Sequence, residues 1–414
     1  LDGSSLTVRN RYHTRTTLHL RFMARREVEG RVIEDVAIDV PTVPPGEAVS
    51  VALDPALLAG DPDAETNVLV TAELARDEPW AKAGHVVATA QFERSPLRSA
   101  TGTRSATEHA SQTCSPEPTD DAWQLGPAVF DSLSGRLREL FGLAVDGPRL
   151  ELWRGPTDND RSETRGSYEL GDPDATGGEG VPGPSSAQRW RTRGLDRLTH
   201  RTLRVTPGPE GLVVAVRSSA AGTALFVDTT YTWCLAGAGD LALRVEINPS
   251  SAWDCTWPRV GLRLDLPTEI DRADWFGTGP AESYPDTARA ARVGRFSATV
   301  DELNVVYSRP QETGHRAAVR ELLLADPSGP RLAVRTLAGP SNRRPGFTLT
   351  RHTPQELDRA RHPYELPDPR HTYLFLDAAV HGVGSRACGI DVLPQHALWP
   401  GAQRFDVVFE RPSN

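Results

Sequence analysis

The feature that most constrains the fold of this chain is the strict alternation of apolar and polar side chains in many short stretches. Apolar residues occupy every second position in 241–247, in 260–265 and in 405–409. Successive side chains of a β-strand point to opposite faces of the sheet, so a period of two predicts half-buried strands. The same pattern at Leu18, Leu20 and Phe22 predicts a strand near the N-terminus. The chain is therefore predicted to be all-β.

One hairpin and one helix are also predicted. The turn AGAGD at 236–240 separates two alternating runs, which should therefore pair as neighbouring antiparallel strands. Thr353, Pro354 and Glu356 supply an N-cap, a first-turn proline and a capping-box partner, and Pro363 ends the run. The rest of the pattern is typical of antiparallel sheet with long loops.

Length and composition predict more than one domain. A chain of 414 residues exceeds what a single hydrophobic core usually supports. Residues 96–120 are rich in Ser, Thr and Ala and almost devoid of apolar side chains, as in a linker. The part before this stretch has the size of a seven-strand sandwich. The part after it suits two wide sheets stacked face to face.

Charge and cysteine spacing exclude several classes. The net charge of -9 argues against nucleic acid as a partner, because a binding face would need clustered positive charge. No apolar run approaches a membrane span, and no signal-peptide pattern opens the chain. Cys114, Cys234, Cys255 and Cys388 lie far apart without metal-ligand spacing, which predicts reduced thiols in a cytoplasmic protein and no metal site. Because the chain starts at Leu1 in mid-pattern without a Met, we expect it to be a fragment, a processed subunit or an expressed set of domains.

Motif searches exclude common catalytic centres. The chain has no GxSxG elbow, no HExxH and no phosphate-binding loop of the Walker type. The glycine-rich stretches 277–282 and 382–389 miss the dinucleotide fingerprint. Residues 158–169 have acids at three calcium-loop positions, but Glu163 stands where that loop needs glycine and no helices are predicted around it.

Six motifs, taken in order, closely resemble the C-terminal two-fifths of the long bacterial β-galactosidases of glycoside hydrolase family 2. They are LTVRNRY at 6–12, EPWAKAGHV at 78–86, LELWRGPTDND at 150–160, GTGPAESYPD at 277–286, RPQETGHR at 309–316 and VGSRACGIDVLPQHAL at 383–398.

The resemblance implies a particular arrangement of domains. It implies an immunoglobulin-like β-sandwich at 1–96, a linker at 97–119, and a large antiparallel β-super-sandwich of the galactose-mutarotase type at 120–414. These sizes agree with those expected from composition.

The resemblance also implies where the chemistry lies. Retaining glycosidases need two carboxylates about 5 Å apart, one as acid and one as nucleophile. In this family both belong to a catalytic barrel that precedes the region matched here, as do the magnesium ligands. We therefore expect no catalytic residue, cofactor or metal in this chain, and no lactose hydrolysis by it alone. The implied partners are the barrel or a large subunit, a β-galactoside, and further copies in an oligomer.

The implied site residues form a rim. In the family, the loop matching Asp158, Asn159 and Asp160 lies beside the sugar subsite, which these residues would shape or gate; alternatively, they satisfy backbone groups of a turn. Some family members place a Trp against the sugar, and Cys388 or Gly389 occupies that position here. The resemblance thus predicts a pocket rim without that aromatic contact.

A second group is ambiguous from sequence. Glu312, His315 and Arg316 either reach the active site or anchor the two sheets through charge-assisted hydrogen bonds. The tryptophans, Trp233 among them, serve either as core or as a sugar platform. Sequence does not choose between these roles.

Two alternatives to an enzyme part stay open. One is a carbohydrate-binding module that holds sugar by itself. The other is a mutarotase-type epimerase, which needs a His acid and a carboxylate base facing one ring. Only His315 and Glu312 offer that pair, and in a strand residues three apart face opposite sides, which counts against it.

Overall fold

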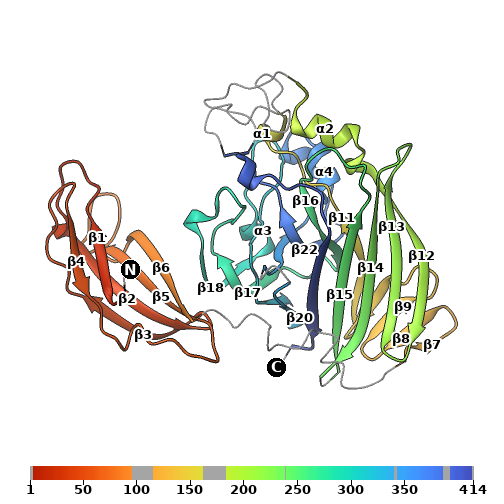
Figure 1. Ribbon diagram of the computed structural model, residues 1–414, viewed down its shortest axis with the longest axis horizontal. Helices are drawn as coiled ribbons and strands as arrows, with labels where there is room; N and C mark the ends of the chain where they lie inside the picture. The colour runs from red at the N-terminus through yellow and green to blue at the C-terminus, as the bar shows by residue number, and fades with distance from the viewer. Residues whose placement is uncertain are drawn as a thin grey trace. The chain divides into compact units, whose positions relative to one another are not determined.

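The computed structural model describes residues 3–95, 115–161, 183–237, 239–339, 343–385 and 392–412. The chain divides into two compact units, Leu1–Thr103 and Arg104–Asn414 (Figure 1). Cys388, Gly389 and most of the predicted linker lie outside the described residues. The domain limits expected from the sequence stay a prediction.

The first unit is a small β-sandwich. Its described strands are β1 (Ser5–Arg9), β2 (Leu20–Val28), β3 (Arg31–Ile38), β4 (Ala48–Ala52), β5 (Thr66–Leu74) and β6 (Val86–Ser95). β1 pairs with β4, and the other four form a sheet in the order β3-β2-β5-β6. Leu6 from the first sheet and Ala24, Val68 and Val70 from the second share one buried core. The described part thus has six strands where the size suggested seven.

Strand β2 begins later than the alternation of Leu18, Leu20 and Phe22 predicted. Thr17–His19 form a 3-10 turn, which Thr16 caps by accepting a hydrogen bond from the Leu18 backbone N–H. Leu18 is consequently 74% exposed, and the strand starts at Leu20. A side-chain cap therefore overrides the period of two at this point.

The second unit contains two large antiparallel sheets. The first sheet has the order β21-β22-β16-β11-β10-β9-β8-β7 and the second has the order β12-β13-β14-β15-β23-β20-β19-β17-β18. The first sheet consists of β7 (Glu117–Pro118), β8 (Ala122–Leu125), β9 (Ala128–Asp131), β10 (Leu137–Leu140), β11 (Leu143–Glu151), β16 (Arg259–Leu266), β21 (Gly346–Thr350) and β22 (Thr372–Val380). The second consists of β12 (Leu198–Gly208), β13 (Gly211–Ala220), β14 (Phe226–Ala236), β15 (Asp240–Pro249), β17 (Arg272–Gly279), β18 (Arg292–Thr299), β19 (Glu321–Asp326), β20 (Gly329–Thr336) and β23 (Gln403–Glu410).

Both sheets face a single core. Leu262 and Leu374 from the first sheet and Leu243 and Phe405 from the second belong to the same buried cluster. Trp233 is fully buried there, and its ring lies edge-on to that of Phe130 with 5.1 Å between centroids. The predicted all-β super-sandwich is confirmed, and Trp233 is a core residue.

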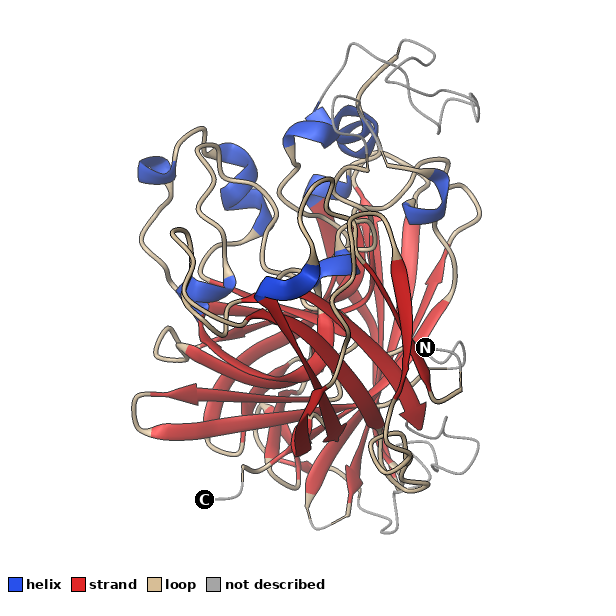
Figure 2. Ribbon diagram, turned by 90° about the vertical axis from the view of Figure 1, so that its left-hand side faces the viewer, coloured by secondary structure: helices blue, strands red, loops and turns tan. Residues whose placement is uncertain are grey.

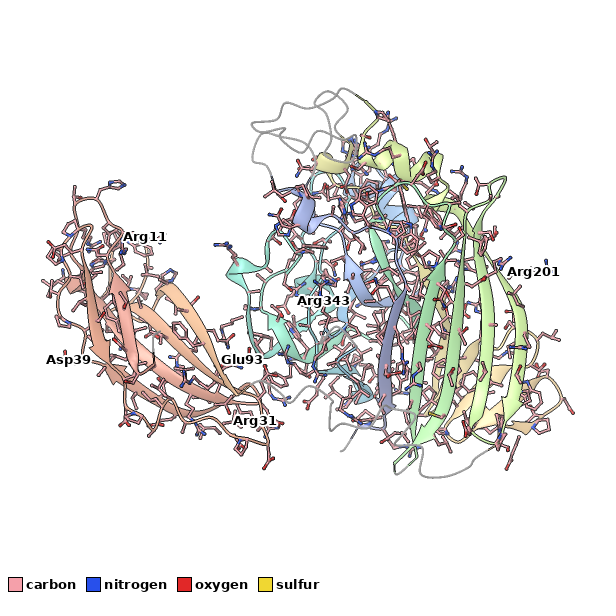
Figure 3. The ribbon with its side chains drawn as sticks, viewed as in Figure 1. Arg11, Arg31, Asp39, Glu93, Arg201 and Arg343 are labelled. Atoms are coloured by element: carbon pink, nitrogen blue, oxygen red, sulfur yellow. The ribbon has the colours of Figure 1, made fainter. Side chains whose placement is uncertain are left out.

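The predicted hairpin is present in the second sheet. β14 and β15 pair across the expected turn, with Trp233 opposite Leu243. On β12, which forms one edge of the second sheet, charged side chains such as Arg201 project outward (Figure 3). Charges on an edge strand discourage further strand pairing.

The described part of this unit also contains short α-helices. They are α1 (Asp158–Arg161), α2 (Ser186–Thr192), α3 (Val300–Leu303) and α4 (Pro354–Arg359). α1, α2 and α4 lie together at one end of the strands (Figure 1), and Figure 2 shows blue helices above the red strands. The predicted capping box of α4 is confirmed, since Thr353 and Glu356 bond each other's backbone N–H. Within the described ranges, no helix combines the length and apolar character that a membrane crossing needs.

Candidate functional site

Strand β11 leads directly into the loop that contains Asp158, Asn159 and Asp160. The chain after β11 buries Trp153 and Arg154, which are 0% and 1% exposed, and then turns into the single helical turn α1. Trp153 packs edge-on against Trp190 of α2, with 6.2 Å between ring centroids. The loop therefore rests on a buried aromatic base.

Asp160 is a structural residue of this loop. Its two carboxylate oxygens accept hydrogen bonds from Arg154, at 2.7 Å from Nη2 to Oδ1 and 3.1 Å from Nε to Oδ2. Oδ2 also accepts one from the Thr157 backbone N–H at 2.8 Å. Arg154 also donates to the carbonyls of His381 and Gly382. Asp160 thus closes its own turn and, through Arg154, ties it to the segment after β22.

Asn159 also binds the segment that follows β22. Its Nδ2 donates to the Val383 carbonyl at 3.1 Å. A Cβ added to Gly384, whose φ is +144°, would lie 1.7 Å from that Nδ2, so only glycine permits this approach. Asp286 accepts hydrogen bonds from the backbone N–H groups of Val383 and Gly384. Asn159 and Asp286 thus both bind this segment.

Asp158 differs from its two neighbours because its carboxylate faces outward. The side chain is 79% exposed, and its Oδ1 lies 4.0 Å from Arg161 Nη1. Only its backbone is fixed, since its N–H donates to Gln311 Oε1 at 3.1 Å. Of the three polar residues, Asp158 alone offers a carboxylate to a ligand.

His381 supports the loop as a neutral side chain. It is 1% exposed and its ring lies edge-on to Trp190. Burial, together with the charge of Arg154, lowers the pKa of His381 well below its ordinary value. Its Nδ1 accepts a hydrogen bond from the Leu398 backbone N–H at 3.0 Å, which requires an unprotonated Nδ1.

Glu312 and His315 belong to a buried charge network around Arg259. Arg259 Nη2 donates to Glu312 Oε1 and to Asp377 Oδ2, each at 3.1 Å. His315 Nδ1 lies 3.3 Å from Asp377 Oδ2, and Tyr284 donates its hydroxyl hydrogen to Glu312 Oε1 at 3.1 Å. Burial would lower the pKa of Arg259, but the two carboxylates outweigh it and raise that pKa. In this network, two buried carboxylates thus share one buried guanidinium.

The structure corrects the expectation that Glu312 and His315 lie in a strand and face opposite sides of it. Residues 309–316 form no strand, so Glu312 and His315 do not face opposite sides of a sheet but converge on the network around Arg259. A sugar has no access to them, because both are at most 5% exposed. A Cβ on Gly346 would lie 2.4 Å from the His315 ring, so backbone packs directly over the imidazole.

Arg316 links loops through their carbonyls. Its guanidinium donates to Pro280 O at 3.1 Å and Gly314 O at 2.9 Å, and also to Leu303 O. Burial lowers the pKa of Arg316. Glu282 binds the same region, since its Oε1 accepts a hydrogen bond from the Thr313 hydroxyl at 2.6 Å. Sequence reasoning named Arg316 but missed Arg154, Arg259 and Asp377, whose burial no local pattern signals.

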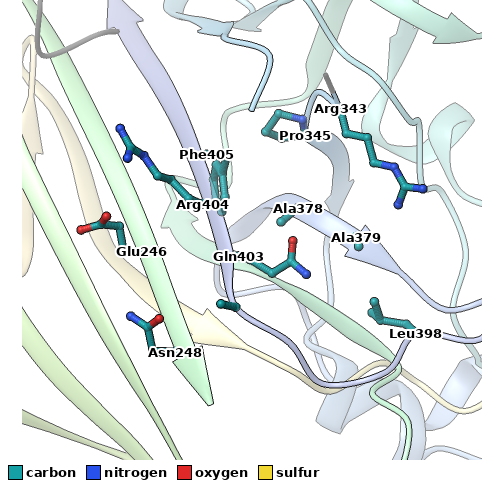
Figure 4. Close-up of a pocket in the computed structure, with 11 residues that line it drawn as sticks. Glu246, Asn248, Arg343, Pro345, Ala378, Ala379, Leu398, Gln403, Arg404 and Phe405 are labelled. Atoms are coloured by element: carbon teal, nitrogen blue, oxygen red, sulfur yellow. The ribbon is translucent and has the colours of Figure 1, made fainter. Parts of the chain in front are cut away.

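A separate cavity lies near the start of β23, where β22 approaches it. It measures about 480 Å³ and has an apolar wall that includes Ala378, Ala379 and Leu398. In Figure 4, Glu246 and Asn248 project from one strand and Gln403 and Arg404 from the next. Within the described chain, none of these four side chains forms a hydrogen bond or ion pair. Among the described residues that the sequence predicted as site residues, none lines this cavity.

No metal site accompanies these features in the part of the chain that the structure describes. There, no group of three or more His, Cys, Asp or Glu side chains is placed to hold an ion. Cys234 and Cys255 are buried, and burial raises the pKa of the Cys234 thiol to about 11.

Comparison with known proteins places the chain in a family. Residues 127–409 match the family described as beta galactosidase small chain, and residues 6–95 match beta-galactosidase domain 4. The chain therefore belongs to the β-galactosidase small-chain family.

Individual relatives agree with this assignment. A β-galactosidase of Arthrobacter sp. (strain B7) is 43% identical over 403 residues, which are 97% of this chain and 39% of that protein. A β-galactosidase of Vibrio cholerae serotype O1 is 30% identical over 368 residues, which are 86% of this chain and 33% of that protein. The chain thus spans between a third and two fifths of these relatives' length.

The structural comparison is weaker. A GalM/aldose epimerase homologue from C. elegans superposes with a TM-score of 0.34 at 10% identity, covering 72% of this chain and 99% of that one. A likeness at that level carries no argument about the activity or the fold of this chain.

Proposed function

We propose that this chain is the C-terminal, non-barrel part of a retaining β-galactosidase, and that its Asp158 loop forms part of the rim of the sugar pocket. The observation that carries the proposal is the 43% identity along 97% of the chain to a β-galactosidase of which it covers only 39%. The remaining length of such a relative is where we expect the catalytic barrel, its two carboxylates and its magnesium. The chain alone is then inactive.

The carboxylates of the site support a role outside the chemical step. A retaining glycosidase needs two carboxyl groups about 5 Å apart that reach the same glycosidic bond. Here Glu312 and Asp377 share the charge of Arg259 and are buried, and Asp160 is bonded to Arg154. Each of these acids is buried and hydrogen-bonded to an arginine, so none is available to attack or protonate a substrate.

Asp158 is suited to binding rather than catalysis. A carboxylate accepts strong hydrogen bonds from hydroxyl groups such as those of a sugar. The surrounding loop is held in place by Asp160 and Asn159, so the backbone at Asp158 is already ordered before a ligand binds. Removing it should weaken ground-state and transition-state binding alike, which raises KM more than it lowers kcat.

The proposal is tested by hydrolysis of a nitrophenyl β-galactoside. The 414-residue chain is assayed alone, and Asp158→Ala is assayed in the intact enzyme that contains this sequence. We expect no activity from the chain alone and a raised KM in the variant. Asp121→Ala is the matched control, because its side chain is 76% exposed and lies on the turn between β7 and β8. Activity of the chain alone, or a variant impaired only in kcat, would refute the proposal.

A second candidate function is carbohydrate binding at the 480 Å³ cavity. This cavity combines amide and charged groups that have no partner within the described chain with an apolar wall, which is the combination that a sugar site uses. We expect galactose, titrated into the chain and followed by calorimetry, to bind saturably if this candidate holds. Glu246→Ala should then abolish the binding, while heat signals that do not saturate would rule the candidate out.

A further inference from the structure

An apolar groove opens beside the Asp158 loop on the second unit. We call it the Val306 groove and define it by Val305, Val306, Tyr307, Leu357, Pro363 and Leu366, which line a cavity of about 250 Å³. Its walls come from the segment after α3, from α4 and from the turn that follows α4. Apolar side chains from three separate segments therefore converge on one surface.

The apolar residues of this groove are unusually accessible. Val306 is 83% exposed and Val305 is 49% exposed. Tyr364, next to Pro363, is 82% exposed as well. Scattered exposed apolar residues are normal, but a contiguous apolar patch with a concave shape marks a surface that another polypeptide covers.

The groove is continuous with the Asp158 loop. Gln311 lines the groove, and its Oε1 accepts the hydrogen bond from the Asp158 backbone N–H. The next residue, Glu312, donates its backbone N–H to Gly155 O at 2.8 Å. A partner that meets Asp158 therefore also meets the beginning of the groove.

We infer that the Val306 groove is the docking surface for the part of the enzyme that lies outside these 414 residues, and that it seats an apolar segment of that part. The inference rests on the proposed function. About three fifths of the Arthrobacter relative lies outside the matched region, since the match covers 39% of it. The shared Gln311 favours this occupant over a second copy, because the missing part is the one expected to meet Asp158.

The test is photo-crosslinking in the intact enzyme. p-Benzoylphenylalanine replaces Val306, and in a control it replaces Leu133, which is 86% exposed in the same unit and outside the groove. We expect a cross-link from position 306 to a peptide outside the 414 residues, and none from position 133. A cross-link to a peptide within the 414 residues, of the same or a second copy, would overturn the inference, as would no cross-link from position 306.

Hydrolysis by the same samples separates this inference from the proposed function. If the intact enzyme does not hydrolyse a nitrophenyl β-galactoside, the proposed function fails whatever the cross-links show. If it does, Val306→Glu should reduce activity on the order of tenfold or more, because it places an unpaired charge in a dry interface. Leu133→Glu should leave activity unchanged. Equal activity of the two variants would count against the groove.

Discussion

Arg154 and Asp160 form a two-pronged ion pair in which the side chains are only 1% and 5% exposed. Removing one partner of a buried pair strands the other charge, at a cost of about 3–5 kcal/mol. We therefore expect Asp160→Ala to lower the free energy of unfolding of the second unit by that amount.

Asp158→Ala is the matched control for this prediction. Asp158 lies two residues before Asp160, and its side chain is largely exposed. Replacing it should therefore change the free energy of unfolding by no more than about 0.5 kcal/mol. The measurement is urea unfolding followed by tryptophan fluorescence, which reports on this unit through Trp153 and Trp190. Similar losses in both variants would mean that the two acids do not have the separate roles assigned to them.

The network around Arg259 gives a second prediction. Arg259→Met should leave the buried Glu312 and Asp377 without a counter-charge and lower the free energy of unfolding by about 3–5 kcal/mol. Arg201→Met on the exposed edge strand should cost less than about 0.5 kcal/mol. Thermal unfolding of both variants would check this. A small loss for Arg259→Met would show that the carboxylates take up protons or water instead of staying charged.

The fold followed from local patterns, whereas this network did not. Alternation at Leu262 and Leu264 and the cap at Thr353 depend on residues close in sequence, so the sequence alone predicted β16 and α4. Leu18 was misplaced because a turn at Thr16 competes with the strand pattern.

The supporting residues of the site depend on distant contacts. Arg259 is 53 residues from Glu312 and 118 residues from Asp377, and neither neighbourhood signals that its charges will be buried together. Within 158–160, sequence could not separate the exposed acid from the buried one, because Arg154 selects Asp160 only after the turn has formed. The family resemblance located the loop, and the three-dimensional contacts divided its residues by role.

His381 leads to a prediction about pH. Its folded pKa lies well below the unfolded value near 6.5, because the ring is buried and close to Arg154. Above pH 6.5 both states are neutral and its contribution to stability is complete. As pH falls below 6.5 the unfolded state takes up a proton that the folded state does not, so stability falls by up to about 1.4 kcal/mol per pH unit.

His381→Asn should remove this dependence, because the amide oxygen can still accept the Leu398 backbone N–H. Urea midpoints at several pH values between 7.5 and 4.5 would give the two profiles, and their difference cancels the titration of the carboxylates. We expect the wild-type curve to fall more steeply. Parallel curves would indicate that His381 is protonated in the folded state.

Gly384 and Asn159 should be energetically coupled. Gly384→Ala places a Cβ 1.7 Å from Asn159 Nδ2 at a φ of +144°, so it should cost both a displaced hydrogen bond to Val383 and backbone strain of about 1–3 kcal/mol. Asn159→Ala removes the obstructing amide and by itself loses a hydrogen bond worth about 1 kcal/mol. In that background Gly384→Ala should retain only the strain. The double-mutant cycle, measured by urea unfolding, should therefore show a coupling of about 1–2 kcal/mol. Additive losses in the free energy of unfolding would mean that Asn159 does not contact Gly384. The Asp158 loop would then not be bound to the segment after β22 by this contact.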